Sequence, residues 1–346
     1  MPIIDPGIAQ RQSGYSIYDD AVKKDILIKA GDQPLTGNVW PVDSVFVDFM
    51  QQVAVDQWKI WLTNFFAKFD FDGIWLDMNE VENFCDGWCY FDQQPDYNND
   101  LEWTESQLPY TPGQRSLNER SLLTSAKHKN GVRELDAHSL YASMEVQATK
   151  DWFDDQDKRS FILSRSGFAG IGKGASRYLG DNFSTAEMMG FSVTGIMAQN
   201  VMGIPLSGAD VCGFFGNTTA DLCAHWYTVA AFQPLSRNHN NINNMEQSPW
   251  SFSNPWIGII RNAMDVKLSL VRYFYSVISN LHTQGGTFYK PLFFEFPDDA
   301  GAYEAQQLNV MLGSALKLGI QSIAVDQDSS EFYYPAGLWC DVYNQD

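Results

Sequence analysis

The segment Gly73-Ile74-Trp75-Leu76-Asp77-Met78-Asn79-Glu80-Val81-Glu82-Asn83-Phe84 indicates both the fold of the chain and the place of its chemistry. Its apolar start, residues 73–76, ends abruptly at the carboxylate of Asp77, and the amide of Asn79 follows two residues later. Buried parallel strands end in this way where they deliver polar side chains to the open end of an α/β sheet or barrel. Asp77 is therefore a candidate for chemistry. The alternative is that Asp77 and Asn79 only cap the next element or fix a loop.

The rest of the chain alternates between helical and strand patterns. From residue 48 to 72 apolar residues recur at helical spacing, and the strand at 74–77 follows directly. Further helices are expected at 139–153, 184–202, 219–232 and 254–284, and further strands at 160–165, 205–208 and 234–237. Ser184 and Glu187 have the spacing of a capping box at a helix start. This alternation predicts a parallel sheet, and polar residues at several strand ends predict the mouth of a barrel.

Other stretches have a different character. The pattern predicts a strand end and a turn at 2–7, mixed loop-like structure at 11–47, a long polar loop over the strand ends at 83–137 and an irregular loop at 167–180. From Tyr289 short apolar runs such as 291–296 are typical of β structure. We therefore expect a barrel domain over residues 1–285 and a second domain with β structure over 286–346.

Composition excludes several classes of partner. The 346 residues carry a formal net charge of −19, which disfavours nucleic acid and anionic membranes. The sequence contains no run of 18 or more apolar residues, so no membrane span is expected, and its start lacks the pattern of a signal peptide. Aromatic residues make up 14% of the chain, and flat aromatic faces suit sugar rings, although most of them will be core residues.

Five cysteines are present: Cys85, Cys89, Cys212, Cys223 and Cys340. None has companion histidines or cysteines at the spacing of a zinc site, so no metal site is expected. Two glycosylation sequons begin at Asn182 and Asn217, and only the second is expected to be usable.

The octapeptide at 73–80 resembles the nucleophile signature of glycoside hydrolase family 31, which comprises α-glucosidases, sucrase-isomaltases and α-xylosidases. The resemblance implies that Asp77 attacks the anomeric carbon. Tyr178-Leu179-Gly180-Asp181-Asn182 resembles the acid/base motif of the same family, which implies that Asp181 is the general acid/base. Taken alone, Gly-Asp-Asn is typical of an ordinary turn. The sequence departs from the family in having Arg177-Tyr178 where His-Trp is usual, so Tyr178 is expected to replace an aromatic wall of the pocket.

The same resemblance implies a set of substrate-binding residues. Arg165, within Ser-Arg-Ser, would reach the sugar and keep Asp77 ionised, with a structural salt bridge as the alternative. His239, within Ser-Arg-Asn-His-Asn, would bind sugar hydroxyls, as would Asp5, which is otherwise a residue that fixes an Asp-Pro turn. The remaining positions that match the family's glucose pocket, each also explicable as core packing, are Trp40, Trp75, Met78 and Phe214.

Two further features rest on the resemblance. Asp210, within Gly-Ala-Asp, matches either a binding or a supporting position, and Cys212 and Cys223 match a disulfide that closes the following loop. That disulfide indicates an oxidising compartment, and we expect a protein of the secretory pathway, lysosomal or extracellular.

The resemblance implies an α/β fold: a (β/α)8 TIM barrel entered at about its third strand, followed by the start of a C-terminal β-sandwich. The family's N-terminal β-sandwich and first two barrel strands are not in the sequence, so a chain truncated at both ends is expected. The implied reaction is retaining hydrolysis of terminal α-linked glucose from oligosaccharides by two carboxylates, with no metal or cofactor. The alternatives are a non-catalytic carbohydrate-binding fragment and an α-xylosidase-type relative.

Overall fold

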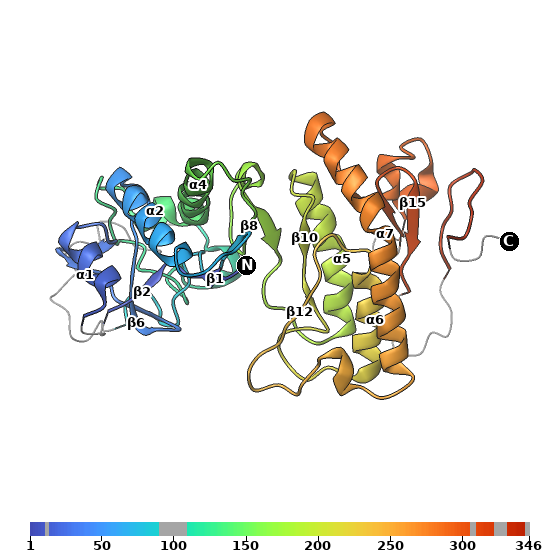
Figure 1. Ribbon diagram of the computed structural model, residues 1–346, viewed down its shortest axis with the longest axis horizontal. Coiled ribbons are helices and arrows are strands. Elements are labelled where there is room, and N and C mark those ends of the chain that lie inside the picture. The colour runs from blue at the N-terminus through green and yellow to red at the C-terminus, as the bar shows by residue number, and fades with distance from the viewer. Residues whose placement is uncertain (11–13, 90–108, 305–308, 322–330, 343–346) are drawn as a thin grey trace. The chain divides into compact units, whose positions relative to one another are not determined.

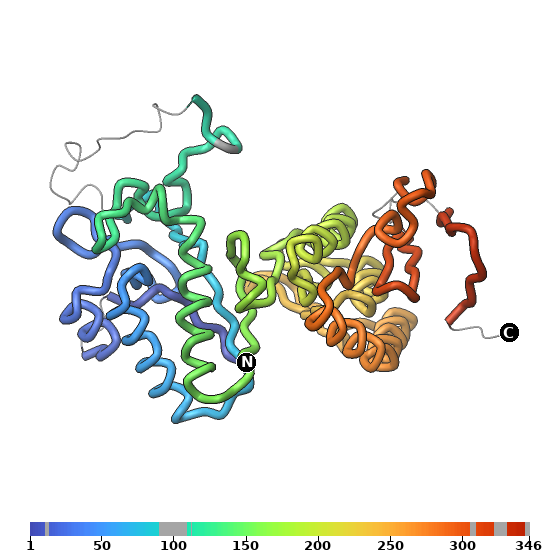
Figure 2. Tube along the Cα trace, turned by 90° about the horizontal axis from the view of Figure 1, so that it is seen from above, coloured from blue at the N-terminus to red at the C-terminus, as the bar shows by residue number. Residues whose placement is uncertain are grey.

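The computed structural model describes residues 1–10, 14–89, 109–304, 309–321 and 331–342. The chain divides into two compact units, Met1–Arg177 and Tyr178–Asp346, and Figures 1 and 2 show the path of the chain through each. Part of the loop expected at 83–137, namely 90–108, lies outside the described residues. Among the described helices, none combines the length and the apolar character that crossing a bilayer requires.

Parallel strands form the centre of the first unit. In the order in which they pair, they are β1 (Ile3–Ile4), β7 (Ile74–Leu76), β8 (Ile162–Ser164) and β9 (Ser176–Tyr178), whose last residue is the first of the second unit. All residues of β7 and β8 are buried, as expected for apolar strands covered on both faces. Gly73 allows a close approach at the start of β7, because an added Cβ would lie 2.6 Å from Phe161 O. The predicted parallel sheet is confirmed.

Two helices of the first unit pack on each other through indole rings. They are α2 (Gln52–Phe66) and α4 (Tyr141–Asp155). Trp58 Nε1 donates to Thr149 Oγ1, and Trp152 Nε1 donates to Thr63 Oγ1, each at 2.9 Å. Each indole therefore combines apolar burial with a satisfied N–H group.

The prediction that residues 11–47 are loop-like is wrong for most of that stretch. The structure places there the helix α1 (Ser16–Lys23) and the strands β3 (Lys29–Ala30), β4 (Gln33–Pro34), β5 (Gly37–Val39) and β6 (Val42–Phe46). β6 pairs antiparallel with both β2 (Gly7–Ala9) and β5. Strands this short, interrupted by glycine, proline and aspartate, give no clear alternation in the sequence. A further short helix, α3 (Glu134–Ala137), precedes α4.

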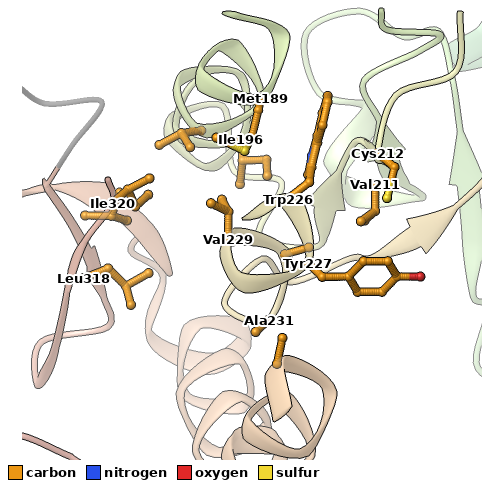
Figure 3. Packing of buried hydrophobic residues seen from close by; sticks show 14 of the residues in the cluster. Met189, Ile196, Val211, Cys212, Trp226, Tyr227, Val229, Ala231, Leu318 and Ile320 are labelled. Atoms are coloured by element: carbon orange, nitrogen blue, oxygen red, sulfur yellow. The ribbon is translucent and has the colours of Figure 1, made fainter. Parts of the chain in front are cut away.

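The second unit has a core between helices and short strands. Its helices are α5 (Ala186–Val201), α6 (Ala220–Ala230) and α7 (Trp256–Gln284), and its first strands are β10 (Ser207–Gly208), β11 (Asp210–Val211) and β12 (Arg237–Asn238). Figure 3 shows buried side chains from several of these elements converging, among them Ile196, Val211 and Trp226, each at most 1% exposed. The helices lie within a few residues of their predicted bounds.

The start of α5 differs from the predicted capping box. Thr185 is the N-cap, and its Oγ1 accepts from Met188 N–H at 3.2 Å. Ser184 Oγ instead donates to Gly216 O at 2.9 Å, so it ties the helix start to a neighbouring loop. The next helix, α6, is capped in the same way by Thr219.

The last part of the second unit is an antiparallel sheet. Its strands are β13 (Tyr289–Pro291), β14 (Asn309–Leu312) and β15 (Leu316–Gly319). The expected β structure at 291–296 is wrong beyond Pro291, because Leu292–Phe294 form a 3₁₀ turn. The change from α/β to antiparallel β follows the end of α7 at Gln284, and the domain boundary near 285 stays a prediction.

Candidate active site

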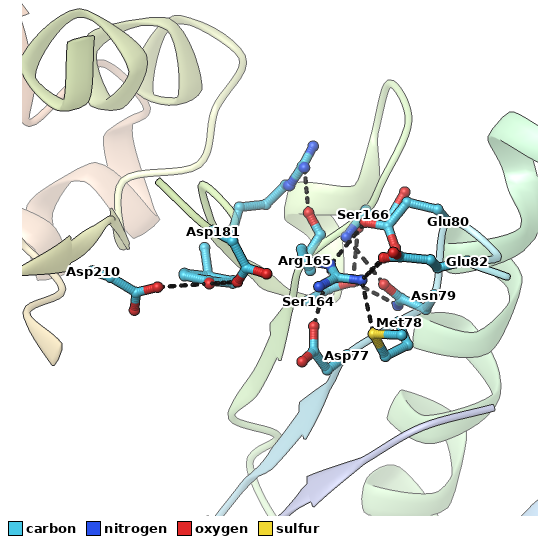
Figure 4. A network of polar contacts seen from close by, with 12 residues as sticks. Asp77, Met78, Asn79, Glu80, Glu82, Ser164, Arg165, Ser166, Asp181 and Asp210 are labelled. Atoms are coloured by element: carbon cyan, nitrogen blue, oxygen red, sulfur yellow. Dashed lines mark hydrogen bonds and ion pairs between the residues drawn. The ribbon is translucent and has the colours of Figure 1, made fainter. Parts of the chain in front are cut away.

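The neighbouring ends of β7 and β8 bring Asp77 and Arg165 together. Leu76 lies opposite Ser164 in the parallel register, so the next residue of each strand emerges at the same edge. Arg165 N–H donates to Leu76 O at 3.2 Å, which continues the ladder by one step. The side chains then meet, with Arg165 Nε 3.2 Å from Asp77 Oδ1 (Figure 4).

Arg165 contacts two further carboxylates that sequence reasoning did not single out. Its Nε and Nη2 donate to the two oxygens of Glu80 at 3.1 and 3.0 Å, and Nη2 also donates to Glu82 Oε2 at 2.6 Å. Burial alone lowers the pKa of Arg165, but the Glu80 hydrogen bonds and the charges of Glu80, Asp77 and Glu82 raise it above its usual value. The single guanidinium group of Arg165 therefore contacts three carboxylates. A sequence signal for both exists, since Glu80 and Glu82 lie in the same segment as Asp77, residues 73–84.

Two apolar residues of the same segment are buried beside this cluster. Trp75 lies within β7 and is 4% exposed, and Met78, directly after Asp77, is 3% exposed. Met78 has a φ of 55°, and its Sδ lies 3.1 Å from Arg165 Nη2. Met78 therefore packs against the cation that pairs with Asp77.

Asp5 follows β1, the strand on the other side of β7. Burial, and then the charge of Asp77, raise the pKa of Asp5 to about 7. Its carboxyl can thus be partly protonated near neutrality, which suits a group that exchanges hydrogen bonds with hydroxyls. Trp40, between β5 and β6, is 70% exposed and makes an edge contact with Phe84 at a centroid distance of 5.3 Å.

In the second unit, Tyr178 joins two carboxyl groups. Its hydroxyl lies 2.8 Å from Asp181 Oδ1 and 2.9 Å from Asp210 Oδ2. The residue is 3% exposed, so the predicted aromatic wall is a buried ring. Asp210 is fully buried in β11 and pairs with Arg237, which lies opposite it on β12 and donates from Nη2 at 2.8 Å.

Burial and the charge of Arg237 act on the pKa values of Asp210 and Tyr178. Burial raises the pKa of Asp210 to about 6, although the Arg237 charge and hydrogen bond oppose the rise. Burial, and then the charges of Asp210 and Asp181, raise the pKa of Tyr178 well above its usual value, so its hydroxyl keeps its proton. The Arg237 guanidinium also lies 4.9 Å from the centre of the Tyr178 ring. Sequence reasoning missed Arg237, which gave no signal beyond its place two residues before His239.

Phe214 and His239 lie together in the second unit, with ring centroids 5.2 Å apart. Burial, and then the Arg237 charge, lower the pKa of His239 below its usual value, so the imidazole is neutral at pH 7. Cys212 and Cys223 form the expected disulfide. A second disulfide, between Cys85 and Cys89, was not predicted, because nothing distinguished that pair from free thiols.

Comparisons with known proteins agree on one family. A sequence profile of the glycosyl hydrolases family 31 TIM-barrel domain matches residues 1–277. Lysosomal alpha-glucosidase of Rattus norvegicus is 34% identical over 344 residues, which cover 98% of this chain and 35% of the relative. Alpha-xylosidase 1 of Arabidopsis thaliana is 32% identical over 363 residues, which cover 99% and 39%.

Solved structures of glucosidases are also similar to this chain. A crystal structure of the Tris-bound glucosidase II alpha subunit aligns with a TM-score of 0.76 and 26% sequence identity, over 94% of this chain and 32% of that chain. The chain thus spans about a third of the length of these relatives.

Proposed function

The chain belongs to glycosyl hydrolase family 31, and on this premise we propose that the protein hydrolyses terminal α-linked glucose from oligosaccharides with retention of configuration. The single observation that carries the proposal is the pair of Asp77 and Arg165 at the carboxyl ends of two parallel strands. A nucleophilic carboxylate must be ionised, and a guanidinium 3.2 Å from Asp77 Oδ1 favours that form.

In the first step Asp77 attacks the anomeric carbon while Asp181 gives its proton to the departing glycosidic oxygen. In the second step Asp181 takes a proton from water, the resulting hydroxide attacks the same carbon, and the bond to Asp77 breaks. Asp181 is exposed, as a group that meets both substrate and water must be. The two steps return both carboxyl groups to their starting states.

We choose the proposed sugar-binding residues by the chemistry of their polar groups or by the exposure of their rings. We assign the hydroxyl contacts to Asp5, His239 and Arg165, whose polar groups have the shifted pKa values described above. Trp40 offers a largely exposed ring for the apolar face of a sugar. That Trp75, Met78, Tyr178 and Phe214 line the glucose pocket stays a prediction.

We also propose that the protein matures in the secretory pathway. Two disulfides, Cys85–Cys89 and Cys212–Cys223, support an oxidising compartment. Asn217, in an N-x-Thr sequon, is exposed and is the proposed glycosylation site. Treatment of the secreted protein with an endoglycosidase, followed by intact-mass measurement, tests this assignment.

The test of the reaction uses the full-length protein with maltose and an aryl α-glucoside. Asp77→Ala and Asp181→Ala are each expected to lower kcat by at least about 100-fold. The matched control is Asp154→Ala, which removes an exposed carboxylate from α4, and it should retain wild-type kcat. NMR of the first-formed product should show the α-anomer. Near-normal turnover in either active-site variant, or a β-anomeric product, would refute the proposal.

A second candidate differs only in the sugar. The identity to alpha-xylosidase 1, 32%, is close to the 34% identity to lysosomal alpha-glucosidase, so overall similarity does not separate the two substrates. Matched aryl α-glucoside and α-xyloside substrates decide between them by kcat/KM. We expect the glucoside to be preferred, and absence of turnover on both would favour a non-catalytic carbohydrate-binding protein.

A further inference from the structure

We propose that Tyr178 is a positioning residue for proton transfer, whose hydroxyl alternates between Asp210 and Asp181 as the proposed acid/base loses and regains its proton. This inference rests on the proposed function of Asp181. It assigns to Tyr178 a role in the reaction that differs from lining the pocket with an aromatic ring.

The Tyr178 hydroxyl has one proton and lies beside two acceptors, the carboxyl groups of Asp181 and Asp210. Tyr178 Oη lies 2.8 Å from Asp181 Oδ1 and 2.9 Å from Asp210 Oδ2, both within hydrogen-bond range. A phenol has a single O–H, so it donates to one carboxyl group at a time while its oxygen accepts from a protonated neighbour. The direction of donation therefore depends on which of the two carboxyl groups carries a proton.

The Tyr178 ring and one of its two carboxyl partners are held in place by Arg237. The ring is buried, the Arg237 guanidinium lies 4.9 Å from its centre, and Asp210 is fixed to Arg237 by bonds of 2.8 and 3.1 Å. Rotation of the hydroxyl needs no movement of the ring. The hydrogen bonds of Tyr178 are thus preorganised, and the protein does not have to rearrange around this residue during the reaction.

The two orientations match the two states of the acid/base. Before bond cleavage Asp181 is protonated, its O–H can donate to Tyr178 Oη, and the Tyr178 O–H points to Asp210. After Asp181 has given its proton to the leaving oxygen, the Tyr178 O–H turns to the new carboxylate and stabilises it. The proton of Tyr178 is never transferred, in keeping with its raised pKa.

Two further titratable or charged residues of the second unit interact with Tyr178, Asp181 and Asp210. Arg237 faces both Asp210 and the Tyr178 ring, and His239 interacts with Asp181 and Arg237. His239 is neutral at pH 7, so the charge balance near neutrality depends on Arg237, Asp181 and Asp210.

The main test is Tyr178→Phe in the full-length protein, which removes the hydroxyl and keeps the ring. We expect kcat/KM for maltose to fall by about 10-fold, part of the 100-fold or more that proton transfer typically contributes. For an aryl α-glucoside with a good leaving group, which needs little acid assistance, we expect a fall of less than about threefold. The basic limb of the maltose profile should move to higher pH, because the ionised acid/base loses a donor.

The matched control is Tyr273→Phe. Tyr273 Oη donates to Leu312 O at 2.6 Å and also hydrogen-bonds with the backbone of Ala315 and Leu316, so Tyr273→Phe deletes hydrogen bonds of the same unit that do not involve Asp181 or Asp210. Tyr273→Phe should lower Tm about as much as Tyr178→Phe does. It should leave the ratio of kcat/KM for maltose to kcat/KM for the aryl glucoside unchanged. If Tyr178→Phe behaves in the same way as Tyr273→Phe, with both substrates affected equally and no pH shift, the inference is wrong.

A readout that needs no turnover separates this inference from the proposed function. Because the Tyr178 hydrogen bond lowers the pKa of Asp210, Tyr178→Phe should raise the Asp210 titration midpoint, measured by NMR of the ¹³Cγ signal. A midpoint that does not move shows that the hydroxyl does not bridge the pair and overturns the inference. An inactive wild-type protein with the expected midpoint shift would instead refute the proposed reaction and leave the bridge established.

Discussion

Asn79 Nδ2 donates a hydrogen bond of 3.0 Å to Glu145 Oε2, and both side chains are completely buried. The same Nδ2 donates to Ser164 Oγ at 2.9 Å, and Asn79 Oδ1 accepts from Ser166 N–H at 3.0 Å. The segment that carries Asp77 is therefore tied to α4 and to the end of β8. Burial raises the pKa of Glu145 well above its usual value, which favours the neutral form of the carboxyl group.

Glu145→Gln should be tolerated, because glutamine keeps the acceptor for Asn79 and is also neutral. We expect a change in the free energy of unfolding below about 1 kcal/mol, whereas Glu145→Ala should cost about 2–4 kcal/mol through a cavity and an unpaired amide. Urea denaturation at pH 7 measures both. In the wild type the folded pKa exceeds the unfolded one, so stability should fall as pH rises above about 4.5. The Gln variant should lose this slope, and equal losses in the two variants would contradict the neutral state.

A second prediction concerns His128, which is fully buried between two carboxylates. Its Nδ1 lies 2.6 Å from Asp48 Oδ1, and its Nε2 lies 3.1 Å from Glu134 Oε2. Burial alone lowers the pKa of His128, but the hydrogen bonds to Asp48 and Glu134 raise it to about 9. Burial likewise opposes the ionised forms of Asp48 and Glu134. The hydrogen bonds and charge of His128, together with the other hydrogen bonds and charges at each carboxylate, outweigh burial and lower both pKa values.

The signs of these shifts define a pH window for stability. The contribution of His128 is complete below its unfolded pKa of about 6.5 and is lost as pH rises through about 9. The contributions of the two carboxylates are complete above their unfolded values, near 4, and are lost as pH falls. The Tm difference between wild type and His128→Asn should therefore be largest between about pH 5 and 6.5. A difference that grows from pH 7 to pH 9.5 would contradict this account.

Arg165→Lys tests whether one cation must bind several carboxylates at once. Lysine keeps the charge, but its ammonium group cannot reproduce the planar fork that contacts Asp77, Glu80 and Glu82. We expect kcat to fall by at least about 10-fold, in the full-length protein, with Tm lowered by only a few degrees. Lys150→Arg, which exchanges a half-buried lysine of α4 for arginine, is the control. Wild-type kcat in Arg165→Lys would show that charge alone suffices.

The disulfide Cys212–Cys223 should stabilise the second unit. It closes a loop with a sequence separation of 11 residues, and loops of this size typically gain about 2–4 kcal/mol. The double variant Cys212→Ala/Cys223→Ala should show this loss in denaturant titration. Cys340→Ala, which removes an exposed free thiol, should not. A reducing agent should destabilise the wild type more than the double variant, in which Cys85–Cys89 is the disulfide left to reduce among the described cysteines.

Elements with a strong apolar signal could be predicted from the sequence. β7 and β8 are continuous apolar runs that end at a charged residue, and this pattern indicated Asp77 and Arg165 before any contact was known. The helices α6 and α7 also lie close to their predicted bounds, because their apolar periodicity extends over many residues.

Contacts between residues far apart in the sequence could not be predicted. Glu145 lies 66 residues after Asn79, and Asp48 lies 80 residues before His128, so no local pattern relates the members of either pair. The sequence predicts an aromatic wall at Tyr178 because this residue stands where the family usually has tryptophan, but the sequence does not give the partners of the hydroxyl. Only the fold shows that its hydroxyl lies between two carboxyl groups.

The sharing of Arg165 among three carboxylates has a consequence for the transition state. Asp77, Glu80 and Glu82 place three carboxylates at the end of β7, where Arg165 contacts all three and Arg120 lies 3.6 Å from Glu82. A sugar ring that develops oxocarbenium character beside Asp77 would enter the field of these carboxylates and gain stabilisation that the uncharged substrate does not. The carboxylates would thus favour the activated sugar over its ground state.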